Sequence, residues 1–166
     1  MINYTEKGYG VHIAINEAGH SLSQVDGVWT SSDDTAVQAI IDSYDPLPEA
    51  QAEALEKVKD ASATKRLEFV TQAAGKDAEY TFKAQEAEQY ETDGTVGIYM
   101  QGRIDATGET ADAVAKEWSS KALNWKRVCA TLSGLEDKAS ADINNETSWQ
   151  QCKVIAESVI EKIKAI

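Results

Sequence analysis

Proline is nearly absent from this chain of 166 residues, and both of its copies stand in the tetrapeptide Asp45-Pro46-Leu47-Pro48. Proline fixes its own φ angle and pushes the preceding residue towards an extended backbone, so the tetrapeptide predicts a stiff joint. Pro48 also suits the first turn of a helix, and the residues that follow it are mostly Ala, Glu, Lys and Gln, which favour helix. The sequence therefore predicts a small α/β module at residues 1–45, a proline joint at 46–48 and an elongated α-helical domain at 49–166.

The apolar residues are mostly small. Alanine supplies 24 residues, whereas Leu, Ile, Val and Phe together supply only 32 of the 166. Alanine lets helices pack closely but buries little area per residue, and the low content of large aliphatic side chains limits the core. We therefore expect long, thin helical structure that depends on a partner for part of its stability.

The first 44 residues have the pattern of a helix, a hairpin and a second helix. Val11 to Ala18 place apolar residues on one helical face, and Gly19 is suited to end that helix. Asp26-Gly27 is a favoured two-residue hairpin turn. Ser31-Ser32-Asp33-Asp34 offers N-caps for the next helix. The apolar face predicted for that second helix consists of Ala36, Val37, Ile40, Ile41 and Tyr44.

Two helical stretches are predicted after the joint, at residues 49–74 and 76–90. The apolar row of the first is weak in its middle, which is typical of a helix that bridges solvent or binds a partner. The predicted rows are Leu55, Val58, Ser62, Arg66, Phe69 and Ala73 in the first stretch, and Tyr80, Ala84 and Ala87 in the second.

Residues 110–164 predict an antiparallel helical hairpin. Thr110 is placed to cap its first helix, and Thr147 to Gln150 has the Thr-x-x-Gln form of a capping box before its second. The first row is Val114, Trp118, Ala122, Trp125, Cys129, Leu132, Leu135 or Glu136, Ala139 and Ile143, and the second is Cys152, Ile155, Ala156, Val159, Ile160 and Ile163. The fold class predicted for the whole chain is mainly α: a small N-terminal helix–β-hairpin–helix module followed by long helices that end in this hairpin.

No motif in the sequence indicates catalysis. His12 and His20 have no third ligand nearby that would complete a metal site. Cys129 and Cys152 fall on apolar rows without an activating histidine, so buried, unreactive thiols are the favoured interpretation. We therefore expect a protein without catalytic residues, cofactor or metal.

The charge of the chain excludes other classes. Acidic side chains outnumber basic ones by 28 to 16, which gives a net charge of −12 and opposes binding to nucleic acids and anionic membranes. No apolar run approaches the roughly 18 residues that would span a bilayer, and the N-terminus lacks the features of a signal peptide. The expected partner is a protein, with a homo-oligomer as an open possibility.

Several short motifs of the chain resemble those of one protein family. They are Gly8-Tyr9-Gly10-Val11-His12, Ala18-Gly19-His20-Ser21-Leu22, the stretch from Asp26 to Asp34, Val37-Gln38-Ala39-Ile40-Ile41-Asp42, the stretch from Tyr44 to Pro48, the stretch from Lys76 to Ala87, and Ala122-x-x-Trp125 with the final helix. Together they resemble small proteins of tailed bacteriophages that are typically encoded beside tail-fibre genes. The resemblance covers most of the chain and supplies no catalytic residues.

The resemblance implies a protein that is made in the host cytoplasm and ends in the virion tail, where it contacts a tail fibre or baseplate protein. The favoured role is a connector or accessory of the fibre, because a stiff joint between a small module and long helices suits a connector. Two other classes stay open. One is a tail-fibre assembly chaperone that is absent from the mature virion, and the other is an enzyme or an acidic inhibitor of a host protein. The candidate partner-binding residues are Tyr9, His20, Trp29 and Tyr44. Of these, Trp29 is favoured because its short hairpin is expected to have little core behind it.

Overall fold

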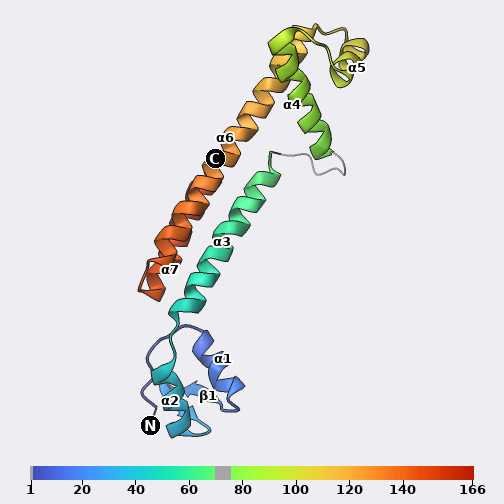
Figure 1. Cartoon of the computed structure of the whole chain (residues 1–166). Coiled ribbons are helices and arrows are strands. Elements are labelled where there is room, and N and C mark those ends of the chain that lie inside the picture. Colours follow the sequence, from blue (N-terminus) through green and yellow to red (C-terminus); the bar gives the residue numbers. More distant parts are fainter. Residues whose placement is uncertain (1, 70–75) are drawn as a thin grey trace. The chain divides into compact units, whose positions relative to one another are not determined.

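The computed structural model describes residues 2–69 and 76–166, apart from the side chain of residue 77. Within these residues the chain forms seven helices and one two-stranded antiparallel sheet (Figure 1). In chain order the elements are α1 (Gly10–Glu17), β1 (Leu22–Val25), β2 (Val28–Ser31), α2 (Asp34–Ser43), α3 (Leu47–Leu67), α4 (Lys76–Asp93), α5 (Ile98–Thr107), α6 (Ala111–Asn144) and α7 (Trp149–Lys164). The predicted fold class, mainly helical with a helix–hairpin–helix start, is confirmed.

The chain divides into two compact units, one formed by residues 1–57 and 139–158, the other by residues 58–138 and 159–166. The predicted joint at residues 46–48 lies inside the first unit, and α3 already begins within it, at Leu47. The division at residues 1–45 and 49–166 stays a prediction. The end of the predicted helix at 49–74, with Ala73, lies outside the described residues.

Local sequence signals set the elements of the N-terminal module, residues 2–44. The amides of Gly19 and His20 close the end of α1 on the carbonyls of Asn16 and Ile15 at 2.9 and 3.0 Å. Asp26 and Gly27 have φ angles of +51° and +80°, the left-handed pair that a two-residue hairpin turn requires. These two signals confirm the predicted helix end and hairpin.

Carboxylates start the next two helices. Asp33 is the N-cap of α2 and accepts hydrogen bonds from the amides of Thr35 and Ala36, both at 3.0 Å. Asp45 Oδ1 accepts from the amide of Leu47 at 3.0 Å and so begins α3. The buried residues of α2 are Val37 and Ile41, which belong to the predicted apolar face.

The predicted apolar row of α3 is buried only in part. Val58 and Ser62 are buried, as is Ala54 outside that row, and Phe69 is exposed rather than buried because α3 ends at Leu67, before its position. Within the second unit, Arg66 Nη1 of α3 donates to Glu136 Oε1 of α6 at 2.8 Å. This ion pair fixes the register of the two helices where few apolar side chains are available.

Helices α4 and α5 and the start of α6 share a small core in the second unit. Its buried members are Ala87, Met100, Val114, Ala115 and Trp118. Thr110 Oγ1 accepts from the amide of Ala113 at 3.3 Å, which confirms the predicted cap of α6. Lys83 of α4 places its ammonium 5.5 Å from the centre of the Trp118 ring and covers this core from the solvent side.

Helix α7 follows α6 after four residues and runs back beside it, as the predicted antiparallel hairpin requires (Figure 1). Cys152, Ala156, Val159 and Ile163 are buried, so the predicted face of α7 is confirmed.

Three predicted details of α6 and α7 are wrong or incomplete. Helix α7 begins at Trp149, one residue later than the predicted cap at Thr147 implies, and Glu146 Oε1 accepts from the amides of Thr147 and Ser148 in front of it. Trp125 is half-buried only, and Val128, outside the predicted row, is buried.

Candidate partner-binding surface

The N-terminal module has a core of its own, made of Ile2, Val11, Ile15, Val37 and Ile41. The segment before α1 reaches this core through a reciprocal pair of hydrogen bonds. Gln38 Oε1 accepts from the amide of Asn3 at 2.8 Å, and Gln38 Nε2 donates to the carbonyl of Asn3 at 3.2 Å. This pair holds Ile2 in the core and places Tyr4 beside the hairpin.

Four ring-bearing residues, Tyr4, Tyr9, His12 and Trp29, form an aromatic cluster on this module. The rings of Tyr4 and Trp29 stack with centroids 4.2 Å apart and planes inclined by 23°. The Tyr4 hydroxyl lies 3.1 Å from His12 Nε2, and the His12 ring lies 5.9 Å from the Trp29 ring. Side chains from the N-terminal segment, α1 and β2 therefore brace one another, which lowers the entropy that each ring would lose on binding.

Tyr9 is the member of the cluster that projects furthest into solvent. It is the N-cap residue of α1, it is 78% exposed, and its ring centroid lies 6.1 Å from that of His12. Ile13, one turn further along α1, is also exposed. The outer face of α1 therefore presents a tyrosine and an isoleucine next to the stacked rings.

The surroundings of the aromatic cluster are acidic. Residues 1–44 carry six acidic side chains and one basic side chain, Lys7. The Lys7 ammonium donates to the carbonyls of Asp42 and Tyr44 at 3.2 and 2.7 Å and so closes the end of α2. Burial, with the nearby Glu6 carboxylate, raises the pKa of Tyr4 above its ordinary value. The cluster thus suits a partner surface that is apolar with neutral or basic groups around it.

Trp29 has more core behind it than the sequence suggested. It is half-buried and packs against the core of the N-terminal module. The expectation of little core behind the hairpin is therefore wrong, because the Tyr4 ring and α1 lie beneath the indole. Trp29 contributes to the module's stability as well as to its surface.

Tyr44 packs against the same core as Tyr4 and Trp29, near Gly10, and is tied to the start of α3. Its hydroxyl donates to Glu49 Oε2, and the same two groups occupy the space that a side chain at Gly10 would need. Burial, followed by the hydrogen bond to the Glu49 carboxylate, raises the pKa of Tyr44 to about 12. Its contacts link α1, α2 and α3.

His20 lies beyond the far end of α1, two residues before β1. Its Nδ1 is 3.5 Å from the hydroxyl of Ser32, which itself accepts from the amide of Ser21 at 3.0 Å. The structure thus brings Tyr9 and Trp29 together around His12, places Tyr44 on the same core near Gly10, and leaves His20 beyond the end of α1. Sequence reasoning did not identify Tyr4 and His12 as members of the aromatic cluster. The one local indication was that the aromatic residue Tyr4 lies two residues after the apolar Ile2.

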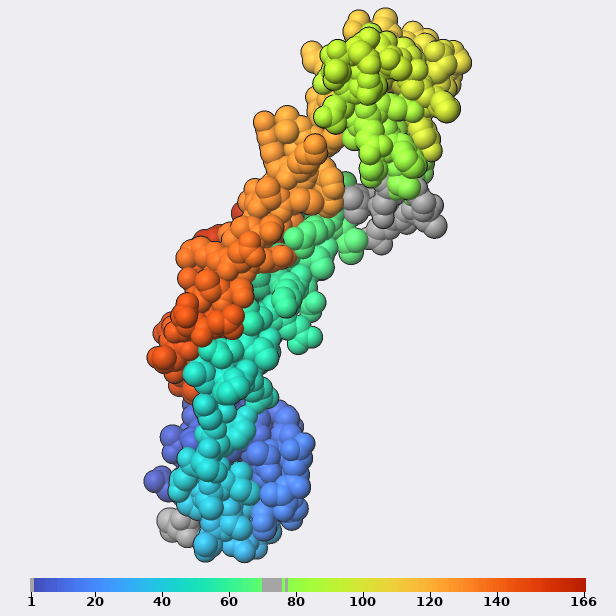
Figure 2. Space-filling view, viewed as in Figure 1, coloured from blue at the N-terminus to red at the C-terminus, as the bar shows by residue number. Residues whose placement is uncertain are grey.

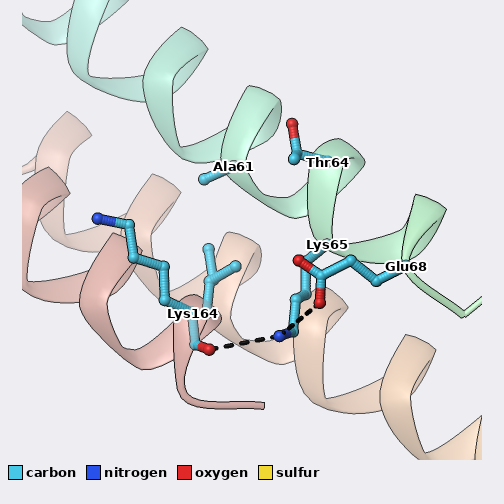
Figure 3. A pocket seen from close by; sticks show the side chains of 6 residues that line it. Ala61, Thr64, Lys65, Glu68 and Lys164 are labelled. Atoms are coloured by element: carbon cyan, nitrogen blue, oxygen red, sulfur yellow. Dashed lines mark hydrogen bonds and ion pairs between the residues drawn. The ribbon is translucent and has the colours of Figure 1, made fainter.

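The described residues show little chemistry of other kinds. No group of three or more His, Cys, Asp or Glu side chains among them is placed to hold a metal ion. Both cysteines are free. A pocket in the second unit is lined by Ala61, Thr64, Lys65, Glu68, Ile163 and Lys164 (Figure 3). There Lys65 Nζ donates to the carbonyl of Lys164 at 3.3 Å and pairs with Glu68 at 2.8 Å, so its ammonium closes the end of α7 (Figure 3).

No family model, curated protein or solved structure matches this chain. Among the helices within residues 2–69 and 76–166, none has an apolar stretch long enough to cross a membrane.

Proposed function

We propose that this chain is a virion protein of a tailed bacteriophage that connects or decorates the tail fibre through protein–protein contacts. Support comes from the motifs that resemble small proteins of the tail-fibre region. The observation that carries the proposal is the aromatic cluster, in which an exposed Tyr9 stands beside the stacked rings of Tyr4 and Trp29. Tyr and Trp are the residues that most often dominate the binding energy of protein interfaces.

Within this proposal, each member of the cluster has a separate task. Tyr9 and Ile13 are exposed enough to insert into a partner. Tyr4 and Trp29 provide a rigid floor, because each ring already packs against the other before binding. The acidic side chains around the cluster favour an approach to a neutral or basic surface on the fibre or baseplate protein.

The experiment is co-expression of the chain with the tail-fibre protein encoded beside it, followed by size-exclusion chromatography. The wild-type chain is expected to elute with the fibre, and Tyr9→Ala is expected to weaken this association at least about tenfold because a central exposed aromatic residue is lost. Tyr80→Ala, which removes another exposed tyrosine from α4, is the matched control and is expected to bind like wild type. Binding that Tyr9→Ala leaves unchanged would contradict the proposed surface.

An assembly chaperone is the second candidate. The observation that favours it is the number of exposed large apolar side chains on different helices of the described chain, such as Leu67, Leu123 and Val154. A holdase uses scattered apolar contacts to hold an immature fibre and then leaves. The two functions differ in whether the protein remains in the finished particle.

A further inference from the structure

The rings of the aromatic cluster have similar orientations on the N-terminal module, which gathers into one lobe in the space-filling view (Figure 2). The His12 plane is inclined by 33° to that of Tyr4, by 32° to that of Tyr9 and by 36° to that of Trp29. The corresponding centroids lie 5.6, 6.1 and 5.9 Å apart. A planar group that lies flat on one of these rings is therefore only moderately tilted against the ring beside it.

Tyr9 leaves most of its ring open to a ligand. The residue is 78% exposed, and its carbonyl accepts from the amides of His12 and Ile13 at 2.9 and 3.4 Å. The ring therefore projects from a backbone that the first turn of α1 holds in place. The face of an aromatic ring is negative, and it attracts a cation that comes within about 6 Å of the ring centre.

Carboxylates lie near the start of α1, where Tyr9 projects. Burial, followed by the Glu6 carboxylate, raises the pKa of Tyr4, so that carboxylate lies close to the cluster. The Glu49 carboxylate occupies the space next to Gly10, the residue that follows Tyr9. Both glutamates are exposed. The rings therefore stand in a negative field, which adds to their attraction for a cation.

The chain supplies no cation of its own to these rings. Lys7 is the one lysine or arginine of residues 1–44, and its ammonium is bound to the carbonyls of Asp42 and Tyr44. In the second unit, by contrast, the Lys83 ammonium lies 5.5 Å from the centre of the Trp118 ring. The aromatic cluster thus combines open ring faces with an unbalanced negative charge, and both features select a cationic ligand over an apolar one.

From these observations we infer that the open face of Tyr9, beside His12, binds an arginine side chain from a basic segment of the partner protein. Arginine is favoured over lysine because its guanidinium is planar and weakly hydrated and stacks flat on an aromatic ring. The nearby carboxylates hold the positive charge at the cluster. The inference rests on the proposed function, because it names the partner chemistry of the same surface.

Fluorescence anisotropy of the purified full chain with two labelled peptides, hexa-arginine and hexa-lysine, tests this site. The two peptides carry the same charge, so the ratio of their dissociation constants measures the preference for guanidinium. In about 0.15 M salt, which screens exposed charges beyond roughly 8 Å, wild type is expected to bind hexa-arginine at least about threefold more tightly. Tyr9→Phe keeps the ring face and should keep this preference. Tyr9→Leu keeps apolar bulk without the ring, and the ratio should fall to about one.

Controls separate this site from the rest of an acidic surface. Both Tyr9 variants should keep the wild-type circular dichroism, because the side chain is so exposed. Tyr80→Leu removes an exposed tyrosine from α4 and should leave the arginine preference unchanged. Glu6→Gln should weaken both peptides about twofold, and more than Glu88→Gln, which neutralises an exposed glutamate of α4.

Four results would overturn the inference. They are equal binding of the two peptides by wild type, an arginine preference that survives Tyr9→Leu, an equal loss of preference in Tyr80→Leu, and an effect of Glu6→Gln no larger than that of Glu88→Gln. The test is separable from that of the proposed function because it needs no phage protein. Fibre binding that depends on Tyr9 without any arginine preference would sink the inference alone. An arginine preference at Tyr9 without fibre binding would sink the proposed function alone.

Discussion

Replacing Glu86 with alanine is expected to destabilise α5 selectively. The Glu86 carboxylate binds the amides of Tyr99 and Met100 across the gap between α4 and α5, at 3.1 and 2.8 Å. No side chain caps α5 at Gly97, its own N-cap residue. In Glu86→Ala both amides lose their acceptor, and the one at Met100 is partly buried. The first turn of α5 should then open more often.

The magnitude follows from the two hydrogen bonds. A hydrogen bond to a charged group contributes about 1.5–3 kcal/mol, and water replaces part of it where the amide is exposed, as at Tyr99. The expected loss of local stability for Glu86→Ala is therefore about 2–3 kcal/mol. Glu86→Gln keeps one acceptor oxygen without the charge and should lose about half as much.

Amide hydrogen exchange of the peptide that covers residues 98–107 measures this loss directly. A local destabilisation of about 2–3 kcal/mol corresponds to exchange that is about 30- to 150-fold faster. The control is Glu88→Ala, which removes an exposed glutamate from the same helix and should change stability by less than about 0.5 kcal/mol.

Equal exchange in Glu86→Ala and Glu88→Ala would mean that the cap between α4 and α5 contributes nothing to the stability of α5. Faster exchange spread evenly over all helices would also contradict this role of the cap, since it would indicate global unfolding rather than opening of α5.

The other predictions concern the core, the ion pair and the aromatic cluster. Trp118→Ala should cost about 3–5 kcal/mol in urea denaturation because its ring is buried, and half-buried Trp125→Ala should cost about half as much; equal costs would contradict the burial difference. The hydrogen bond from Arg66 holds the pKa of Glu136 below its ordinary value of 4.5, so the stabilisation from this carboxylate is present above that pH and is lost as the pH falls through the lower, folded-state pKa. The stability difference between wild type and Glu136→Gln should accordingly shrink as a denaturation series moves from about pH 6 to about pH 3, and a constant difference would exclude the ion pair as its cause. Trp29→Ala should lower the stability of the N-terminal module by about 2 kcal/mol besides weakening partner binding, as thermal circular dichroism and the co-expression assay would show; an unchanged melting temperature would mean that the stack on Tyr4 contributes nothing.

Features with short-range causes could be predicted from the sequence. The turn at Asp26-Gly27, the cap at Thr110 and the buried face of α7 each depend on residues within a few positions of one another. Such signals act through local backbone geometry and helical periodicity, which a single sequence displays.

Features that depend on distant residues could not be predicted. Glu86 lies 13 residues from Tyr99 in sequence, and Asn3 lies 35 from Gln38, so neither pairing has a local pattern. The aromatic cluster was found only in part for the same reason, because Tyr4 reaches Trp29 through the Asn3–Gln38 contact. The start of α7 differs by one residue from the prediction, and the Glu146 carboxylate binds the amides of Thr147 and Ser148 just before it.

The proposed role, a component of a bacteriophage tail, is best tested by quantitative mass spectrometry of purified particles of a phage whose genome carries this gene. The copy number is measured against the major tail protein. A fixed small number of copies is expected in every particle, in a simple ratio to the tail fibre. Absence from particles, together with abundance in infected cells, would contradict a virion role and favour an assembly chaperone.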